Sequence, residues 1–423
     1  MNKFLQIFKI KDLRKKILSV LFLLLVFRVL AAIPIPGIDR VSLQQFFSNN
    51  QLFGFLNIFS GGGLSNLSVM MLGVGPYITA TIIMQLLTII FPRLKEIYFE
   101  EGSEGQAKFN RISRYLTVPL AALQAYGFLN LFVSQHILQP MPLISMLNNV
   151  IVITAGSMLL MWIGELISEY KIGNGISLII FAGIVSRIPS ELSTLLINPN
   201  QQFISIYLPF IILSIFVIGG VVFVNEGERK IPVVYAKQIR GNRIYSGGSS
   251  YLPIRINQAG VIPIIFAISL LFFPQFLAQI VAIISPQTSL TLNKLVTEFF
   301  NNVFIYSLLY FIFVVVFTYF YTAIVFDPVE ISKSLQRSGG FIPGIRPGDT
   351  TSNFIKTIVN RTTLFGAIFL GVVAILPNIM GIITNTKSLV IGGTSLLIVV
   401  SVALEVMKQL ESQLTIREYE GIL

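Results

Sequence analysis

The residues of this 423-residue sequence that could bind a charged partner are gathered in two polar stretches, near 225–258 and 327–360. The candidate docking side chains in them are basic: Arg229, Lys230, Lys237, Arg240 and Arg243 in the first stretch, and Arg346 in the second. Clustered Lys and Arg attract acidic surfaces and nucleic-acid phosphates. The pattern predicts electrostatic docking of an acidic or RNA-bearing partner, with the ordinary positive charge of cytoplasmic membrane-protein loops as the alternative.

The string FIPGIRPGDT at 341–350 favours docking over that alternative. Its two X-Pro bonds and two glycines stiffen a turn-rich segment. We therefore expect a rigid loop tip that presents Arg346 outward.

The sequence offers few groups for catalysis or metal binding. It has no cysteine and a single histidine, His136, which excludes thiol nucleophiles, zinc–thiolate sites and histidine clusters. It also lacks the Gly-Lys dipeptide of a Walker-type phosphate loop and the Gly-x-Ser-x-Gly elbow of a hydrolase. We expect no enzyme activity, no cofactor and no metal, and we expect His136 to be a solvated residue at a helix end.

The elements that position the basic residues must lie in a membrane. Hydrophobic residues make up 54% of the chain and charged residues 12%, whereas a soluble domain carries about 25% charged residues. The mean hydropathy is +0.79. Because a helix satisfies its own backbone hydrogen bonds in lipid, the composition predicts an all-α polytopic membrane protein.

Ten windows are apolar over the roughly 20 residues that a spanning helix needs. They lie at about 17–33, 73–92, 115–135, 148–168, 174–196, 204–224, 260–284, 303–326, 361–383 and 388–408. Of the 30 Lys and Arg, 25 fall on the side that holds both termini and four on the other side. Since basic residues stay cytoplasmic during insertion, both termini are expected in the cytoplasm. The alternative for the first window is a cleaved signal peptide.

Ionisable residues are almost absent from these windows. Arg28 is the main exception, and we expect it to snorkel from the outer end of the first helix to the interface. Ion-coupled transporters bury acidic or cationic residues near mid-membrane, and the windows hold no clear example. The windows therefore do not indicate transport driven by ions bound to the protein's own helices, and an ion-coupled secondary solute transporter built from inverted repeats stays an alternative. A pore-less insertase or a scaffold for membrane enzymes is a third possibility.

Residues 52–72 are apolar but interrupted by three consecutive glycines, Gly61, Gly62 and Gly63. The run is too broken for a spanning helix and too apolar for an exposed loop. Non-helical backbone at membrane depth survives only where it is buried in protein or lines a cavity. The segment is therefore predicted to be re-entrant, with a disordered outer loop as the alternative.

Seven strings stand in a fixed order along the chain. They are LNIFSGGGLSNLS (56–68), LGVGPYITATIIMQLL (72–87), IGNGISLIIFAGIV (172–185), PVVYAK (232–237), YLPIRINQAGVIPIIFA (251–267), FIPGIRPG (341–348) and GGTSLLIVV (392–400). Together they resemble the SecY family, the central subunits of bacterial protein-conducting channels. The likeness covers nearly the whole chain.

The resemblance implies a SecY-like clamshell in which ten transmembrane helices form two pseudo-symmetric, inverted five-helix halves, 1–200 and 201–423. An hourglass pore would run between the halves. Its waist would be a ring of apolar side chains, here Val74, Ile78, Ile176, Ile180, Ile265 and Ile398. A plug at about 56–68 would fill the outer funnel, with Phe59, Ser60, Gly61, Gly62, Gly63 and Leu64 at its centre. Gln85 and Asn257 are the candidate lateral-gate residues.

The resemblance also implies partners and a location. Members pass unfolded secretory polypeptides across the membrane and release transmembrane segments sideways into lipid. The energy comes from the SecA ATPase or the ribosome, whose rRNA the cytosolic loops would contact, and the small subunits SecE and SecG complete the channel. Signal peptides, nascent chains and membrane lipids are the other expected partners. The expected location is the cell inner (plasma) membrane, with the thylakoid membrane as the alternative.

Overall fold

The computed structural model describes residues 10–35, 57, 60–64, 66–99, 101–134, 137–186, 189, 202–235, 238–240, 243–245, 249–284, 286–384 and 387–419. Most of these residues form helices. In the first part of the chain they are α2 (Lys11–Ala31), α5 (Gly75–Ile90), α6 (Pro92–Phe99), α7 (Gly102–Ser134), α8 (Leu143–Glu169) and α9 (Gly175–Val185). In the second part they are α11 (Gln202–Glu226), α12 (Ile262–Ile284), α13 (Pro286–Asn301), α14 (Val303–Val325), α15 (Pro328–Arg337), α16 (Asp349–Thr384) and α17 (Lys387–Tyr419).

Each of the ten predicted spans overlaps one of these helices, and the all-α polytopic membrane fold is confirmed. Among the described residues, four stretches are long and apolar enough to cross a membrane: Gly102–Val133, Leu143–Glu169, Val303–Arg337 and Asp349–Leu376. Two further helices, Gly75–Thr88 and Pro92–Tyr98, pass the same test together and are bent by 113°. Three shorter apolar helices lie at Gly175–Val185, Ser214–Glu226 and Ile262–Gln275. The count of ten spans stays a prediction.

Large apolar side chains cover the outside of the helices. Phe22 on α2 is 64% exposed, Phe216 on α11 is 78% exposed and Phe304 on α14 is 75% exposed. A soluble protein rarely exposes so much contiguous apolar surface. In this chain the surface matches the hydrocarbon of a bilayer.

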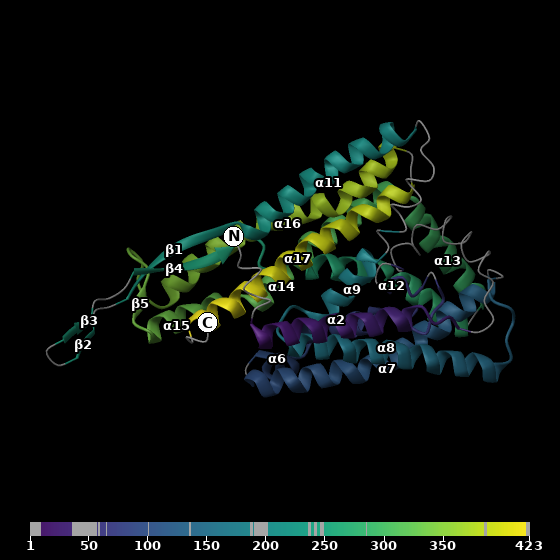
Figure 1. The fold of residues 1–423 in the computed structure, drawn as a ribbon, viewed down its shortest axis with the longest axis horizontal. Helices are drawn as coiled ribbons and strands as arrows, with labels where there is room; N and C mark the ends of the chain where they lie inside the picture. Colours follow the sequence, from purple (N-terminus) through teal and green to yellow (C-terminus); the bar gives the residue numbers. More distant parts are fainter. Residues whose placement is uncertain are drawn as a thin grey trace.

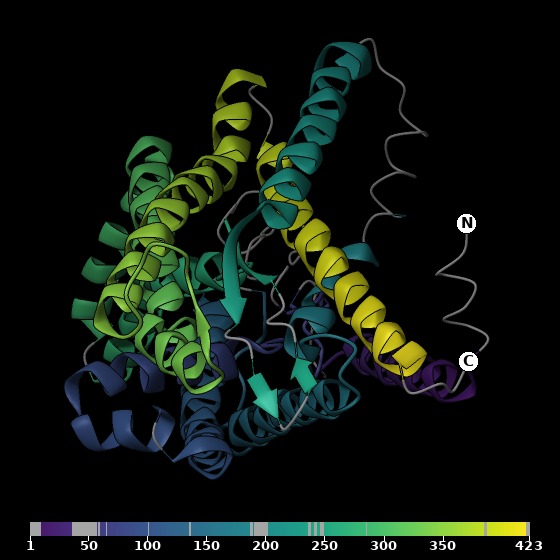
Figure 2. The same ribbon diagram turned by 90° about the vertical axis from the view of Figure 1, so that its left-hand side faces the viewer.

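The helices before residue 186 pack mainly with one another, and so do the helices after residue 202. In the first group α2 contacts α8 and α9, while α7 contacts α5 and α8. In the second group α11 contacts α16 and α17, and α14 contacts α12 and α16. The principal contacts between the groups are those of α12 with α5 and α7, and of α17 with α9. Figure 1 shows α11, α16 and α17 above and α2, α7 and α8 below, and Figure 2 shows the blue and the green helices on different sides.

Two small sheets occupy the segment between α11 and α12, which the sequence analysis left as a polar loop. Strands β1 (Glu228–Tyr235) and β4 (Ser249–Arg255) form an antiparallel hairpin, and β5 (Gly340–Phe341) from the second polar stretch pairs with β1. Beyond this sheet, β2 (Gln238–Arg240) and β3 (Arg243–Tyr245) form a second hairpin at the far end of the molecule from α13 (Figure 1). The two predicted loops therefore meet in one structured unit.

The unit has its own apolar core. Ile231, Val233 and Ile254 from the β1–β4 hairpin pack with Ile342 and with Ile355 of α16. Strand alternation explains this arrangement, because the buried residues of β1 are two positions apart while Pro232 between them is exposed. A docking surface carried by this unit would be rigid.

Candidate functional site

The six residues of the predicted apolar ring belong to one buried cluster. They come from both helix groups: Val74 caps α5 and Ile78 lies in it, Ile176 and Ile180 lie on α9, Ile265 on α12 and Ile398 on α17. Five of them are almost inaccessible, with exposures of 0% (Val74), 6% (Ile78), 0% (Ile180), 6% (Ile265) and 1% (Ile398). Ile176 is partly buried and packs against the same cluster. All six therefore belong to one large buried cluster to which both helix groups contribute, and their convergence on a common axis stays a prediction.

Local sequence explains why α9 can place two of these residues. Asn174 caps the helix, since its Oδ1 accepts hydrogen bonds from the backbone N–H groups of Ile176 (3.0 Å) and Ser177 (3.3 Å). Gly175 lies so close to α8 that a Cβ would stand 1.8 Å from the carbonyl oxygen of Gly164. The glycine fixes α9 tightly against α8. Ile176 and Ile180 then share one face of the helix, four residues apart.

Residues 60–64, the described centre of the predicted plug, form a compact turn. The backbone N–H of Gly62 donates to the carbonyl of Asn57 (2.9 Å), and that of Gly63 donates to the carbonyl of Ser60 (3.2 Å). Gly61 and Gly62 have φ of +63° and +87°, which favour glycine. Ser60 and Leu64 are 1% exposed. The segment is buried in the protein, as its sequence predicts, and Phe59 lies outside the described residues.

Two contacts hold Gly61 of the plug, and the sequence analysis predicted neither. On one side Phe27 of α2 is so close that a Cβ on Gly61 would lie 2.4 Å from an atom of its aromatic side chain. On the other side Gly183 of α9 is so close that its own Cβ would lie 2.2 Å from the Cα of Gly61. Phe27 belongs to the same buried cluster as the ring. The turn therefore packs on α2 and α9, two helices that also contribute to that cluster.

A cavity of about 500 Å³ borders the ring. Three ring residues line it, Ile78, Ile176 and Ile265, together with polar residues from the ends of α8 and α9. Among these, Glu165 of α8 pairs with Arg114 of α7, with 2.6 Å between the carboxylate oxygen and Nε. The cavity therefore leads from a polar rim to an apolar constriction.

The two candidate gate residues have different surroundings, and their role in a lateral gate stays a prediction. Gln85 on α5 is 8% exposed and lines the cavity together with Phe266 of α12. Its Oε1 has no hydrogen-bond partner among the residues that the structure describes. It therefore lies where the two helix groups meet. Asn257 instead donates from Nδ2 to Oδ1 of Asn225 (2.8 Å) at the end of α11. Asn257 thus ties the base of the β1–β4 hairpin to its own half.

The candidate docking residues are distributed over the structured cytosolic unit. Arg229 and Lys230 on β1 are exposed, and so is Arg346 in the turn between β5 and α16. The turn is anchored from within, because Thr351 Oγ1 donates to the carbonyl of Arg346 at 2.8 Å. A neighbouring bond runs from Ser332 Oγ to the carbonyl of Gly348 at 2.7 Å.

Two docking candidates, Arg240 and Arg243, lie at the ends of β2 and β3 that are joined by the hairpin turn. The backbones of Arg240 and Arg243 face each other across that hairpin (Figure 1). Their side chains, like the whole of Lys237, lie outside the described part of the chain, as does His136.

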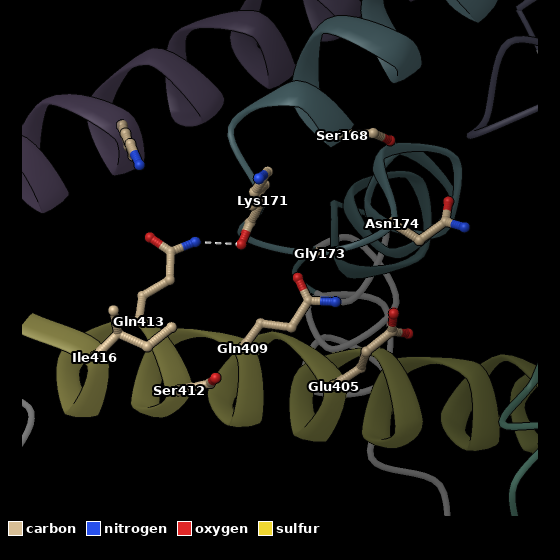
Figure 3. Close-up of a pocket in the computed structure, with 10 residues that line it drawn as sticks. Ser168, Lys171, Gly173, Asn174, Glu405, Gln409, Ser412, Gln413 and Ile416 are labelled. Atoms are coloured by element: carbon tan, nitrogen blue, oxygen red, sulfur yellow. Dashed lines mark hydrogen bonds between the residues drawn. The ribbon is translucent and has the colours of Figure 1, made fainter. Parts of the chain in front are cut away.

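The second meeting point of the two groups joins α17 to the turn between α8 and α9. There the Gln413 side-chain amide donates to the carbonyl of Lys171, and Glu405 and Gln409 point from α17 toward the same turn (Figure 3). A cavity of about 720 Å³ lies between them. Close by, Leu13 of α2 and Leu414 of α17 bury each other. The groups are therefore tied together on two sides, at α12 and at α17.

Comparison with known proteins identifies the family. The SecY family pattern matches residues 68–407. The chain is 41% identical to the protein translocase subunit SecY of Mycobacterium bovis over 443 aligned positions, with 100% of both chains covered. The chain belongs to the SecY family. The SecY subunit of Corynebacterium glutamicum is equally similar, at 41% identity and full coverage.

Solved structures share the fold of this SecY-family chain. A structure described as a protein-conducting channel has a TM-score of 0.65 and 21% identity, and the match covers 93% of this chain and 90% of that one. Sec61 in a canine ribosome–channel complex has a TM-score of 0.60, 20% identity and the same coverage. The family is a multi-pass membrane component of the bacterial Sec translocase and is not catalytic.

Proposed function

We propose that the chain is a passive conduit for unfolded polypeptides, which pass between its two halves, 1–200 and 201–423. The observation that carries this proposal is the single buried cluster that holds Val74, Ile78, Ile176, Ile180, Ile265 and Ile398, contributed by both helix groups. An apolar constriction of this kind can part around a chain, and it gates ions by dewetting when closed. It offers no fixed charge that would trap an ion.

The glycine turn at Gly61–Gly63 supports a plug below that constriction. It contacts the ring of Phe27 and the backbone of Gly183, from two helices that contribute to the cluster. A segment that must leave its site needs soft dihedrals and few deep side-chain anchors, and the consecutive glycines supply both. In the closed state the turn would fill the outer funnel.

The contact of α12 with α5 and α7 supports a lateral gate at that side of the molecule. Gln85 borders this contact, and its buried Oε1, which accepts no hydrogen bond from the described residues, could accept one from a chain that parts the helices. A hydrophobic signal sequence that inserts between the helices gains about 0.3–0.6 kcal/mol for each Leu, Ile, Phe or Val. Transmembrane segments would leave through the same opening into lipid.

The exposed arginines of the cytosolic unit support docking of an external energy source. SecA and the ribosome are the two candidates, and several structural neighbours of the chain are ribosome-bound Sec61 and Ssh1 complexes. Arg229, Lys230 and Arg346 would face acidic side chains or rRNA phosphates, so that added salt weakens binding. SecE and SecG would complete the channel in the membrane.

The distribution of basic residues supports the orientation. The cytosolic unit and the ends of α2 and α17 that meet at Leu13 and Leu414 carry most of the Lys and Arg. We place both termini in the cytoplasm and the chain in the inner membrane of a bacterial cell.

The test of this function is deletion of residues 57–67. The channel should still insert and fold, because the ring cluster comes from helices outside the deletion, and its ion conductance in planar bilayers should rise. If the deletion variant reaches normal abundance but conducts no more ions than the unaltered channel, residues 57–67 do not act as a plug. The proposal that they close the channel would then be wrong.

A further inference from the structure

Arg28 is a cation in the middle of an apolar surface. It lies on α2 between neighbours that face outward, with Leu25 59% exposed and Val29 57% exposed. Placing a charge at membrane depth is costly, and such residues face the protein interior or a water-filled space, where they meet a partner. The sequence analysis expected Arg28 to reach the interface. The structure instead directs its guanidinium to the protein.

The partner is the backbone of the plug. Nη1 of Arg28 donates to the carbonyl oxygen of Gly61, with 2.6 Å between the two atoms. A Cβ on Gly62 would lie 3.7 Å from the same nitrogen, so the guanidinium also lies beside the second glycine of the turn. The positive φ of Gly61 and the turn bond from Gly62 to Asn57 fix this part of the plug backbone. Phe27, the residue before Arg28, packs on Gly61 as well.

These contacts exist only while the plug is in place. A charge-assisted hydrogen bond is short and strong, and it gains strength where water is excluded. When the plug leaves, the carbonyl of Gly61 and the guanidinium separate, and water in the opened funnel must solvate both. An interaction made in one state only shifts the equilibrium toward that state.

We propose that Arg28 is a positioning residue that latches the plug in the closed channel, through the carbonyl of Gly61. The latch rests on the proposed function of the plug. Its chemistry is a cation held against a main-chain oxygen, so the sequence of the plug around the glycines can vary while the latch persists.

The first experiment measures ion conductance of Arg28→Met and Arg28→Lys channels in planar bilayers. Met has a similar length and no donor, and we expect it to raise the open fraction roughly 10- to 100-fold, which corresponds to about 1.4–2.8 kcal/mol. Lys keeps the charge that insertion requires but lacks the planar fork, and a smaller rise is expected. Leu25→Ala, a lipid-facing change on the same helix, is the matched control and should leave the conductance unchanged.

The second experiment combines Arg28→Met with deletion of residues 57–67, as a double-mutant cycle. If Arg28 acts through the plug, the substitution adds no conductance once the plug is gone. Equal increases with and without the plug would overturn the latch, because Arg28 would then act on the helices. The latch would also be overturned if both Arg28 variants conduct like the unaltered channel while the deletion variant leaks. In that case the proposed function of the plug would still hold. If Arg28→Met fails to insert into the membrane, Arg28→Lys replaces it in the double-mutant cycle.

A deletion variant that conducts no more ions than the unaltered channel has a different meaning. In that case the plug function itself is wrong, and the latch falls with it. Membrane abundance and protease resistance of each variant show that a change in conductance does not come from misfolding.

Discussion

Gly183→Ala tests the contact between α9 and the plug with the smallest possible change, one methyl group. The new Cβ would lie 2.2 Å from the Cα of Gly61, whereas non-bonded carbons prefer a separation of about 3.5–4.0 Å. The obstructing atom is backbone, so no side-chain rotation relieves the clash. The plug must shift by more than about 1 Å or leave its site.

The cost falls on the closed state alone, because the displaced plug no longer meets α9. Overpacking of a tight core costs about 1–3 kcal/mol, so the ratio of closed to open channels should fall roughly 5- to 150-fold. The assay is single-channel recording of purified protein in planar bilayers, where the open fraction should rise. In a channel that lacks residues 57–67, Gly183→Ala should have no further effect.

Gly219→Ala is the matched control, since Gly219 is also a helical glycine and a Cβ there meets nothing within 4 Å. It should leave the open fraction unchanged, with at most a small gain in helix stability of about 1 kcal/mol. If Gly183→Ala and Gly219→Ala channels open equally rarely, the plug does not seal the channel by resting on α9.

Two further predictions concern the ring and the docking unit. Ile398→Asn places an amide in a site that is 1% exposed, and an unsatisfied buried polar group costs about 1–3 kcal/mol. The closed state should therefore be destabilised and defective signal sequences should be exported, whereas the control Ile398→Val should not have this effect. Unaltered signal selectivity in an export assay would count against the ring. Arg346→Glu should lower translocation into reconstituted vesicles several-fold, because it weakens partner docking. The control Lys356→Glu reverses another exposed charge, on α16, and should not lower it. Translocation by Arg346→Glu at the unmutated rate would show that Arg346 is not part of the docking surface.

The helices could be predicted from the sequence because a membrane imposes simple rules. Apolar length and the distribution of Lys and Arg depend on local composition, and each predicted window overlaps a helix. The prediction of the ring residues needed more than local composition. The i, i+4 spacing of Ile176 and Ile180 predicts a shared helix face but not which face, so the family resemblance was needed to select those residues, and the structure places them in one cluster.

What the sequence did not predict depends on contacts between distant residues. Strand β5 pairs with β1 across about a hundred residues of chain, and neither strand has a hydrophobic pattern long enough to stand out. The partner of Arg28 is a main-chain carbonyl, which has no sequence signal. The hydrogen bond from Asn257 to Asn225, which lies 32 residues earlier, likewise has no signal in the sequence, and the gate role of Asn257 stays a prediction.

The most direct test of a shared pore is crosslinking of a stalled secretory chain to single cysteines at Ile78, Ile176 and Ile398. The chain has no cysteine of its own, so each engineered thiol is unique. Phe216, which is 78% exposed on the outside of α11, provides the lipid-facing control position. Crosslinks from all three ring positions and none from position 216 are expected; a stalled chain that reacts at position 216 but at none of the ring positions would show that polypeptides do not pass between the two halves.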